Sequence, residues 1–183
     1  LAACAGPQPT TPAATAAATP ATRGPAPVTA SPAKIPGAGT RPPLCDAPQP
    51  ARQDPYPFNR DAARRDATLG AGQLTGQSGY TGGIAWFEDL DAAELAWLLN
   101  EQYIDPHEAQ NAAPTVWEIF GFLCAHSTVR AAGYVVSIDR PDYRTSIESI
   151  YGRKPDAGLR AAAQSFCTDA EATFDDRLEC FWD

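Results

Sequence analysis

The sequence predicts a mainly α protein, in which a long disordered N-terminal tether precedes a small disulfide-stapled helical domain. This domain would hold five or six short helices and at most one short β-hairpin. Three observations predict this fold. Residues 5–50 are rich in proline and alanine and contain few large apolar side chains. From residue 91 onward, helix-capping signals precede apolar residues at helical spacing. Four of the five cysteines lie at or beyond residue 45, which favours two disulfides.

Composition divides the chain into residues 1–4, a tether over 5–50, a polar and glycine-rich connector over 51–83, and a helical domain over 84–183. The tether holds twelve of the eighteen prolines. Such a segment buries too little apolar surface to offset the entropy lost on ordering, so we expect it to be disordered. Within the connector, Asn59 is typical of the N-cap of a short polar helix.

The helical domain is predicted to begin with two or three helices. Asp91 and Glu94 form a capping-box pattern, and Asp105-Pro106 predicts a second, short helix that ends by Pro114. A further capping box at Thr115–Glu118 predicts a helix over 115–131, with Gly133 as its C-terminal stop.

The remaining chain shows one β signal and three more helix starts. Residues 134–138 are rich in β-branched side chains and predict a strand, for which residues 84–87 are a possible partner. Helix starts follow at Pro141-Asp142, at Pro155-Asp156 and at Thr168–Glu171. The apolar residues behind the first and last starts recur at helical spacing; they are Tyr143, Ile147, Ile150 and Tyr151, and then Phe174, Leu178 and Phe181.

Cys45, Cys124, Cys167 and Cys180 allow three disulfide pairings. If Cys180 lay deep in a final helix, about ten residues of rise would place it about 15 Å from Cys167, beyond the reach of a disulfide. We therefore favour Cys124–Cys167 and Cys45–Cys180. Buried free thiols are the alternative.

The charge distribution argues against nucleic acid as a partner. The chain carries a net charge of −8. Residues 1–50 hold Arg23, Lys34 and Arg41 against Asp46, which leaves −10 for the remainder. A domain this acidic repels nucleic-acid phosphates. No apolar run reaches the roughly 18–20 residues that span a bilayer.

No motif identifies a catalytic residue, a metal site or a cofactor site. His126 lies two residues after Cys124, so on a helix the two side chains would point apart, and His107 is expected on the surface. Carboxylates are plentiful, but no pair is distinguished by its spacing, so catalysis stays open and is the less favoured reading. Trp97 and Trp117 lie off the main apolar stripes of their helices. They either complete a wide buried face or form a binding surface for sugar or protein.

Leu1-Ala2-Ala3-Cys4 resembles the lipobox of bacterial lipoproteins, which is a hydrophobic residue, two small residues and a cysteine. The resemblance implies a signal peptide upstream of Leu1 and a mature protein that begins at Cys4 with a diacylglyceryl group. It also implies that Ala5, not being aspartate, permits sorting to the outer membrane in a Gram-negative cell. An anchored Cys4 would explain the odd number of cysteines.

These observations lead to one functional expectation with two alternatives. We expect an envelope lipoprotein, held in the bilayer through Cys4, whose folded domain is a non-catalytic module that binds an envelope protein or a cell-wall polymer. The first alternative is a periplasmic or cell-wall enzyme that uses carboxylates. The second is an accessory lipoprotein of a secretion or surface complex.

Overall fold

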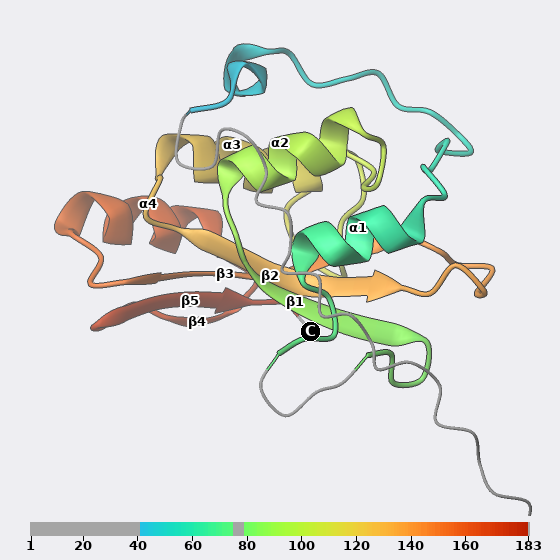
Figure 1. Cartoon of the computed structure of the whole chain (residues 1–183). Helices are drawn as coiled ribbons and strands as arrows, with labels where there is room; N and C mark the ends of the chain where they lie inside the picture. The colour runs from blue at the N-terminus through green and yellow to red at the C-terminus, as the bar shows by residue number, and fades with distance from the viewer. Residues whose placement is uncertain (1–40, 75–78, 183) are drawn as a thin grey trace, which may run out of the picture. The chain divides into compact units, whose positions relative to one another are not determined.

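The computed structural model describes residues 41–74 and 79–182, which fold around one antiparallel sheet (Figure 1). The sheet has five strands in the order β1-β2-β3-β5-β4, and every neighbouring pair is antiparallel. The strands are β1 Ile84–Leu90, β2 Arg130–Val136, β3 Thr145–Arg153, β4 Glu171–Thr173 and β5 Arg177–Phe181. The prediction of a mainly α fold is therefore wrong, although the expected pairing of residues 84–87 with the strand after Gly133 is confirmed.

The helices lie together on one side of the sheet (Figure 1). They are α1 Ala62–Leu69, α2 Ala92–Asn100, α3 Val116–Ala125 and α4 Ala157–Phe166, and a short 3-10 turn, η1, covers Pro43–Asp46. Their apolar faces and one face of the sheet form a single core, which includes Phe87, Leu95, Phe120, Ile150 and Trp182. No described helix is long and apolar enough to cross a membrane.

Three predicted helix starts are confirmed by their caps. The Asp91 and Thr115 side chains each accept a hydrogen bond from the backbone N–H three residues later. The glutamate at that later position accepts a hydrogen bond from the backbone N–H of the cap residue, so both capping boxes form. Asp156 caps α4 in the same position. Each cap satisfies backbone donors that the first helical turn leaves free.

Other predicted boundaries are wrong. Helix α3 ends at Ala125 rather than 131, because the chain turns there into β2. Residues 105–114 form turns in place of a short helix. Helix α1 is capped by Asp61 rather than Asn59, whose side chain accepts a hydrogen bond from the Asp61 N–H.

The segment after Pro141 is a strand, and a β-bulge explains its helical appearance. In β3, Ser149 pairs with Ala132 and Ile147 with Gly133, so Glu148 is an extra residue. A bulge of this kind breaks the two-residue alternation of a strand. It leaves the buried Ile147 and Ile150 three residues apart, which imitates the spacing of a helix. Strand β1 shows the same effect between Phe87 and Leu90.

The chain after Thr168 is a hairpin rather than a helix, and this changes the disulfides. Strand β5 alternates, with Leu178, Cys180 and Trp182 buried on the core side. Because the hairpin returns along α4, the Cα atoms of Cys167 and Cys180 lie 6.0 Å apart and the two residues form a disulfide. The second disulfide joins Cys45 to Cys124. The expectation of two disulfides is confirmed, and the favoured pairing is wrong.

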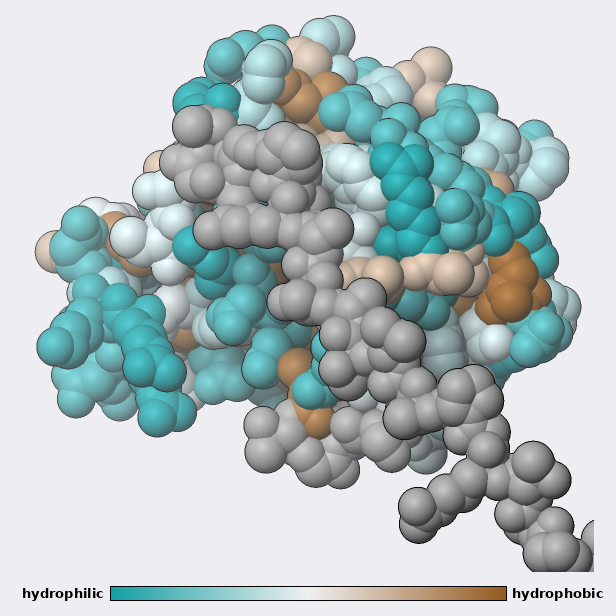
Figure 2. Space-filling view, viewed as in Figure 1, coloured by the Kyte–Doolittle hydropathy of each residue, from teal (hydrophilic) through white to brown (hydrophobic). Residues whose placement is uncertain are grey.

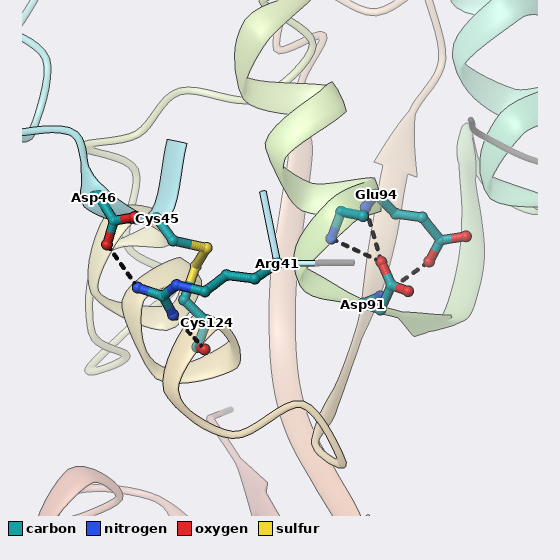
Figure 3. The surroundings of a disulfide bond; sticks show 7 residues. Arg41, Cys45, Asp46, Asp91, Glu94 and Cys124 are labelled. Atoms are coloured by element: carbon teal, nitrogen blue, oxygen red, sulfur yellow. Dashed lines mark hydrogen bonds and ion pairs between the residues drawn. A yellow bond between two sulfur atoms is a disulfide. The ribbon is translucent and has the colours of Figure 1, made fainter. Parts of the chain in front are cut away.

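Residues 41–59 form a strap over the helical layer, at the top of Figure 1. Its first end is held by the Cys45–Cys124 disulfide and by Arg41, which pairs with Asp46 and donates to the Cys124 carbonyl, both at 2.8 Å (Figure 3). The other end is held by the Asn59 N–H, which donates to the Gln102 carbonyl. Part of the predicted tether, from residue 41 to 50, thus belongs to the folded domain, and residues 5–40 lie outside the described residues.

Helix α1 joins the sheet through a fully buried arginine. Arg65 donates to Asp66 at 2.8 Å and to the carbonyls of Val136 and Arg144, and its guanidinium lies 4.6 Å from the centre of the Tyr143 ring. A buried charge is tolerated only when it is paired and hydrogen-bonded in this way. The predicted connector therefore contributes part of the folded domain.

Replacing Gly133 tests the bulge. A Cβ at this position would lie 2.0 Å from the Ser146 carbonyl oxygen, so we expect Gly133→Ala to lower the free energy of unfolding by about 3 kcal/mol or more. The matched control is Gly121→Ala, because Gly121 lies within α3 with nothing near its missing Cβ. There alanine should raise the stability by about 0.5–1 kcal/mol. Urea denaturation measures both, and equal small effects would contradict the register.

Candidate functional site

The face of the sheet opposite the helices is the candidate site, here called the outer face. Strand register assigns its residues: Ala85 and Val135 pair in the core, so their neighbours Trp86 and Tyr134 point to the other side. The same alternation extends across the sheet. The outer face carries Trp86 and Glu88 of β1, Ala132 and Tyr134 of β2, Ser146, Ser149, Tyr151 and Arg153 of β3, and Arg177, Glu179 and Phe181 of β5.

The outer face contains a hollow of about 320 Å³. The small side chains of Ala132 and Ser149 line it together with larger side chains of β1, β3 and β5. Four of the larger side chains are charged. Glu88 and Glu179 supply carboxylates, and Arg153 and Arg177 supply guanidinium groups.

Tyr151 is fixed as one wall of this hollow. Its hydroxyl donates to the Asp89 carboxylate at 2.8 Å and accepts from the Asp89 N–H at 2.7 Å. Burial, and then the hydrogen bond to Asp89, raises the pKa of the Tyr151 hydroxyl. Asp89 has a φ of 62°, a left-handed conformation that costs free energy for a residue other than glycine. The bulge of β1 thus positions the aromatic ring at the edge of the hollow.

The loop between α2 and α3 adds a second polar cluster at the edge of β3. The Ser146 hydroxyl donates to Glu108 Oε1, and Arg144 Nε lies 3.8 Å from the same oxygen. Arg144 also donates to the Tyr134 hydroxyl at 2.8 Å, and that hydroxyl donates to Gln110 at 3.1 Å. These contacts hold the loop against the first residues of β3, which do not pair with β5.

Glu108 is unusual because its carboxyl group is mostly buried. Burial raises its pKa to about 7, against the opposing effects of the Ser146 hydrogen bond and the nearby Arg144. Its second oxygen, Oε2, is buried and has no hydrogen-bond partner in the described residues. A raised pKa is also a feature of catalytic acids. Ser146, however, is fully buried, and Glu108 lines none of the four hollows.

The structure places the two predicted binding tryptophans on the helical side, away from the outer face. Trp97 lies against Tyr103, with ring centres 5.1 Å apart, and below the Arg64 guanidinium. Trp117 packs on Phe120 and lines a hollow beneath the strap. Both are half-buried against the core. A binding role for either one stays a prediction.

The other predicted residues are dispersed. The His107 Nε2–H donates to the Pro50 carbonyl at 2.8 Å, so His107 helps to hold the strap. His126 ends α3 and lies against Phe122. Cys4 lies outside the described residues. Among residues 41–74 and 79–182, no three side chains of His, Cys, Asp or Glu converge as a metal ligand set.

The outer-face residues of β3 and β5 were missed because these two segments were assigned to helices, whereas Trp86 and Tyr134 lie in segments that were predicted as strands. One signal was available: Arg177, Leu178, Glu179, Cys180 and Phe181 alternate between polar and buried positions, which is typical of a strand with one open face. Nothing comparable marks Glu108, whose environment depends on a loop reaching β3 from 38 residues away.

Comparison of the chain with protein-family models, with curated proteins and with solved structures finds no match.

The Glu108 carboxyl predicts a pH dependence of stability. Because its folded-state pKa is raised above the ordinary 4.5, the folded state binds a proton more tightly than the unfolded state between these values. Stability from this group is full below about pH 4.5 and is lost as the pH rises through about 7. Glu108→Gln should remove about 1–3 kcal/mol of the difference in unfolding free energy between pH 5 and pH 8.

The control for this measurement is Glu171→Gln, which changes an exposed carboxylate of β4. Chemical denaturation at the two pH values measures the difference for each protein. An unchanged pH dependence in Glu108→Gln would contradict the buried setting of this carboxyl group.

Proposed function

We propose that this protein is an envelope lipoprotein, anchored through Cys4, whose α+β domain binds another envelope component on the outer face of its sheet. The observation that carries the proposal is that this face bears half-buried aromatic rings and a charged hollow, while the described helices all lie on the opposite side. The domain is a non-catalytic binding module in this account.

Two features support the anchor. The sequence Leu1-Ala2-Ala3-Cys4 fits a lipobox, and the other four cysteines pair with one another, which leaves Cys4 as the odd one. Disulfides form in compartments outside the reducing cytoplasm, and the domain of a lipoprotein would lie in such a compartment. The proline-rich residues between Cys4 and the strap would act as a spacer from the bilayer.

The surface supports binding through the sheet rather than through the helices. Figure 2 has the view of Figure 1, with both the helices and the sheet in sight, and the hydrophobic patches on this side are small and separate. The helical side is further covered by the strap. On the outer face, Phe181 is 37% exposed beside the charged hollow; the other exposed large apolar side chain in the described residues is Tyr80, which bonds to Arg65 and Asp66 of α1. An exposed aromatic ring next to partnerless charges is typical of a binding surface.

The geometry favours binding over catalysis. A catalytic acid or base must be able to reach a substrate. Among the described residues, Glu108 is the carboxyl group with a strongly raised pKa, and it points into a buried contact with Ser146. The contacts between its loop and β3 account for the burial of Glu108, so no catalytic role is needed to explain it. Glu88 and Glu179, the two carboxylates of the hollow, are exposed rather than buried.

Fractionation of cells tests the anchor. The wild-type protein, produced from its native gene, should enter the soluble fraction only with detergent, whereas Cys4→Ala should be released without it, because the acyl chains provide the membrane affinity. Thr11→Ala, which changes the tether and leaves Cys4 intact, is the control. A Cys4→Ala protein that stays in the membrane fraction without detergent would contradict the anchor.

Site-directed photocrosslinking tests the binding face. A benzoylphenylalanine at Phe181 replaces one aromatic ring on the outer face with another and should form adducts with an envelope component in intact cells. The same group at the exposed Ala161 of α4 should not. Adducts from Ala161 with none from Phe181 would place the partner on the helices and refute the proposal.

A further inference from the structure

Arg153 and Arg177 face each other directly across β3 and β5, and both line the hollow of the outer face. Like charges at directly opposite positions of an antiparallel pair are unfavourable. No carboxylate lies within ion-pair distance of either guanidinium in the described residues, although Glu88 and Glu179 line the same hollow.

This pair is an exception among the arginines. Eleven arginines lie in the described residues, and eight of them have a side-chain hydrogen bond, an ion pair or a ring contact there. The three without one are Arg52, Arg153 and Arg177. Two of these three lie side by side and line the same hollow of the outer face, in a domain whose net charge is strongly negative.

We propose that Arg153 and Arg177 form a subsite for an oxyanion, a carboxylate or a phosphate, carried by a small polar ligand. Guanidinium groups present parallel N–H donors that match the oxygens of such anions. A bound anion would neutralise the repulsion within the pair. The inference rests on the proposed function, because it assigns a ligand chemistry to the outer face.

The other walls of the hollow define the rest of the ligand. Glu88 of β1 and Glu179 of β5 lie on opposite flanks of the hollow. Each accepts hydrogen bonds and repels a second anion, so the ligand must offer donor groups to both. The fixed ring of Tyr151 gives an apolar wall for a ring or an aliphatic segment. An acidic sugar, with one carboxylate and several hydroxyls, has this combination of groups, and the hollow has the size of a small-molecule site.

Calorimetric titration of the full chain tests the subsite. The probes are glucuronate, its methyl ester, which keeps the hydroxyls without the charge, and inorganic phosphate, which supplies the charge alone. Wild type should bind glucuronate saturably, phosphate more weakly and the ester not at all. Arg153→Gln and Arg177→Gln should each weaken glucuronate binding about ten-fold or more, the effect of losing a charged hydrogen bond.

Arg52→Gln is the matched control, because it removes another partnerless arginine outside the hollow, and it should leave binding unchanged. Urea denaturation separates binding from folding: loss of either arginine of the pair should leave the unfolding midpoint unchanged or raise it, since repulsion is removed. The inference is overturned by an absence of saturable binding, by equal binding of the ester, or by an equal loss in Arg52→Gln. Adducts from Phe181 without glucuronate binding would refute the subsite and leave the proposed function standing.

Discussion

The structure depends on the packing of one sheet against helices on a single face. Two bulges adjust the strands to this constraint: they let Phe87 and Leu90 of β1, and Ile147 and Ile150 of β3, point into the same core despite their odd spacing. The close approach of Gly133 to Ser146 is where the β3 bulge forms. Because side chains alternate along a strand, fixing the core face also fixes the polar residues of the outer face.

The helical layer is held from outside by the strap. The Cys45–Cys124 disulfide closes a separation of 79 residues, and Arg41 and His107 add polar contacts at points along the same segment. The second disulfide, between Cys167 and Cys180, ties the end of α4 to β5. Cross-links of this kind stabilise a small domain chiefly by restricting its unfolded state. No described helix covers the outer face, because α1, α2, α3 and α4 all lie on the opposite side of the sheet.

The sequence predicted local features well and the sheet poorly. Caps at Asp91, Thr115 and Asp156 depend on contacts within four residues, and the structure confirms all three. Strand β3 was assigned to a helix because one extra residue turns a two-residue period into a helical one, whereas residues 84–87 of the bulged β1 were predicted as a strand. The disulfide pairing was wrong because it assumed a helix at Cys180, which lies in the regularly alternating strand β5. The candidate site depends on cross-strand register, which local patterns do not determine.

We expect the outer face to be exposed in the isolated protein and covered by its partner in the envelope. Hydroxyl-radical footprinting read out by mass spectrometry tests it on aromatic rings of both faces. Tyr151 and Phe181 should be labelled in the purified chain and protected in intact envelopes, while the buried Phe87 and Trp182 should resist labelling in both. Equal labelling of Tyr151 and Phe181 in the two preparations would contradict the account.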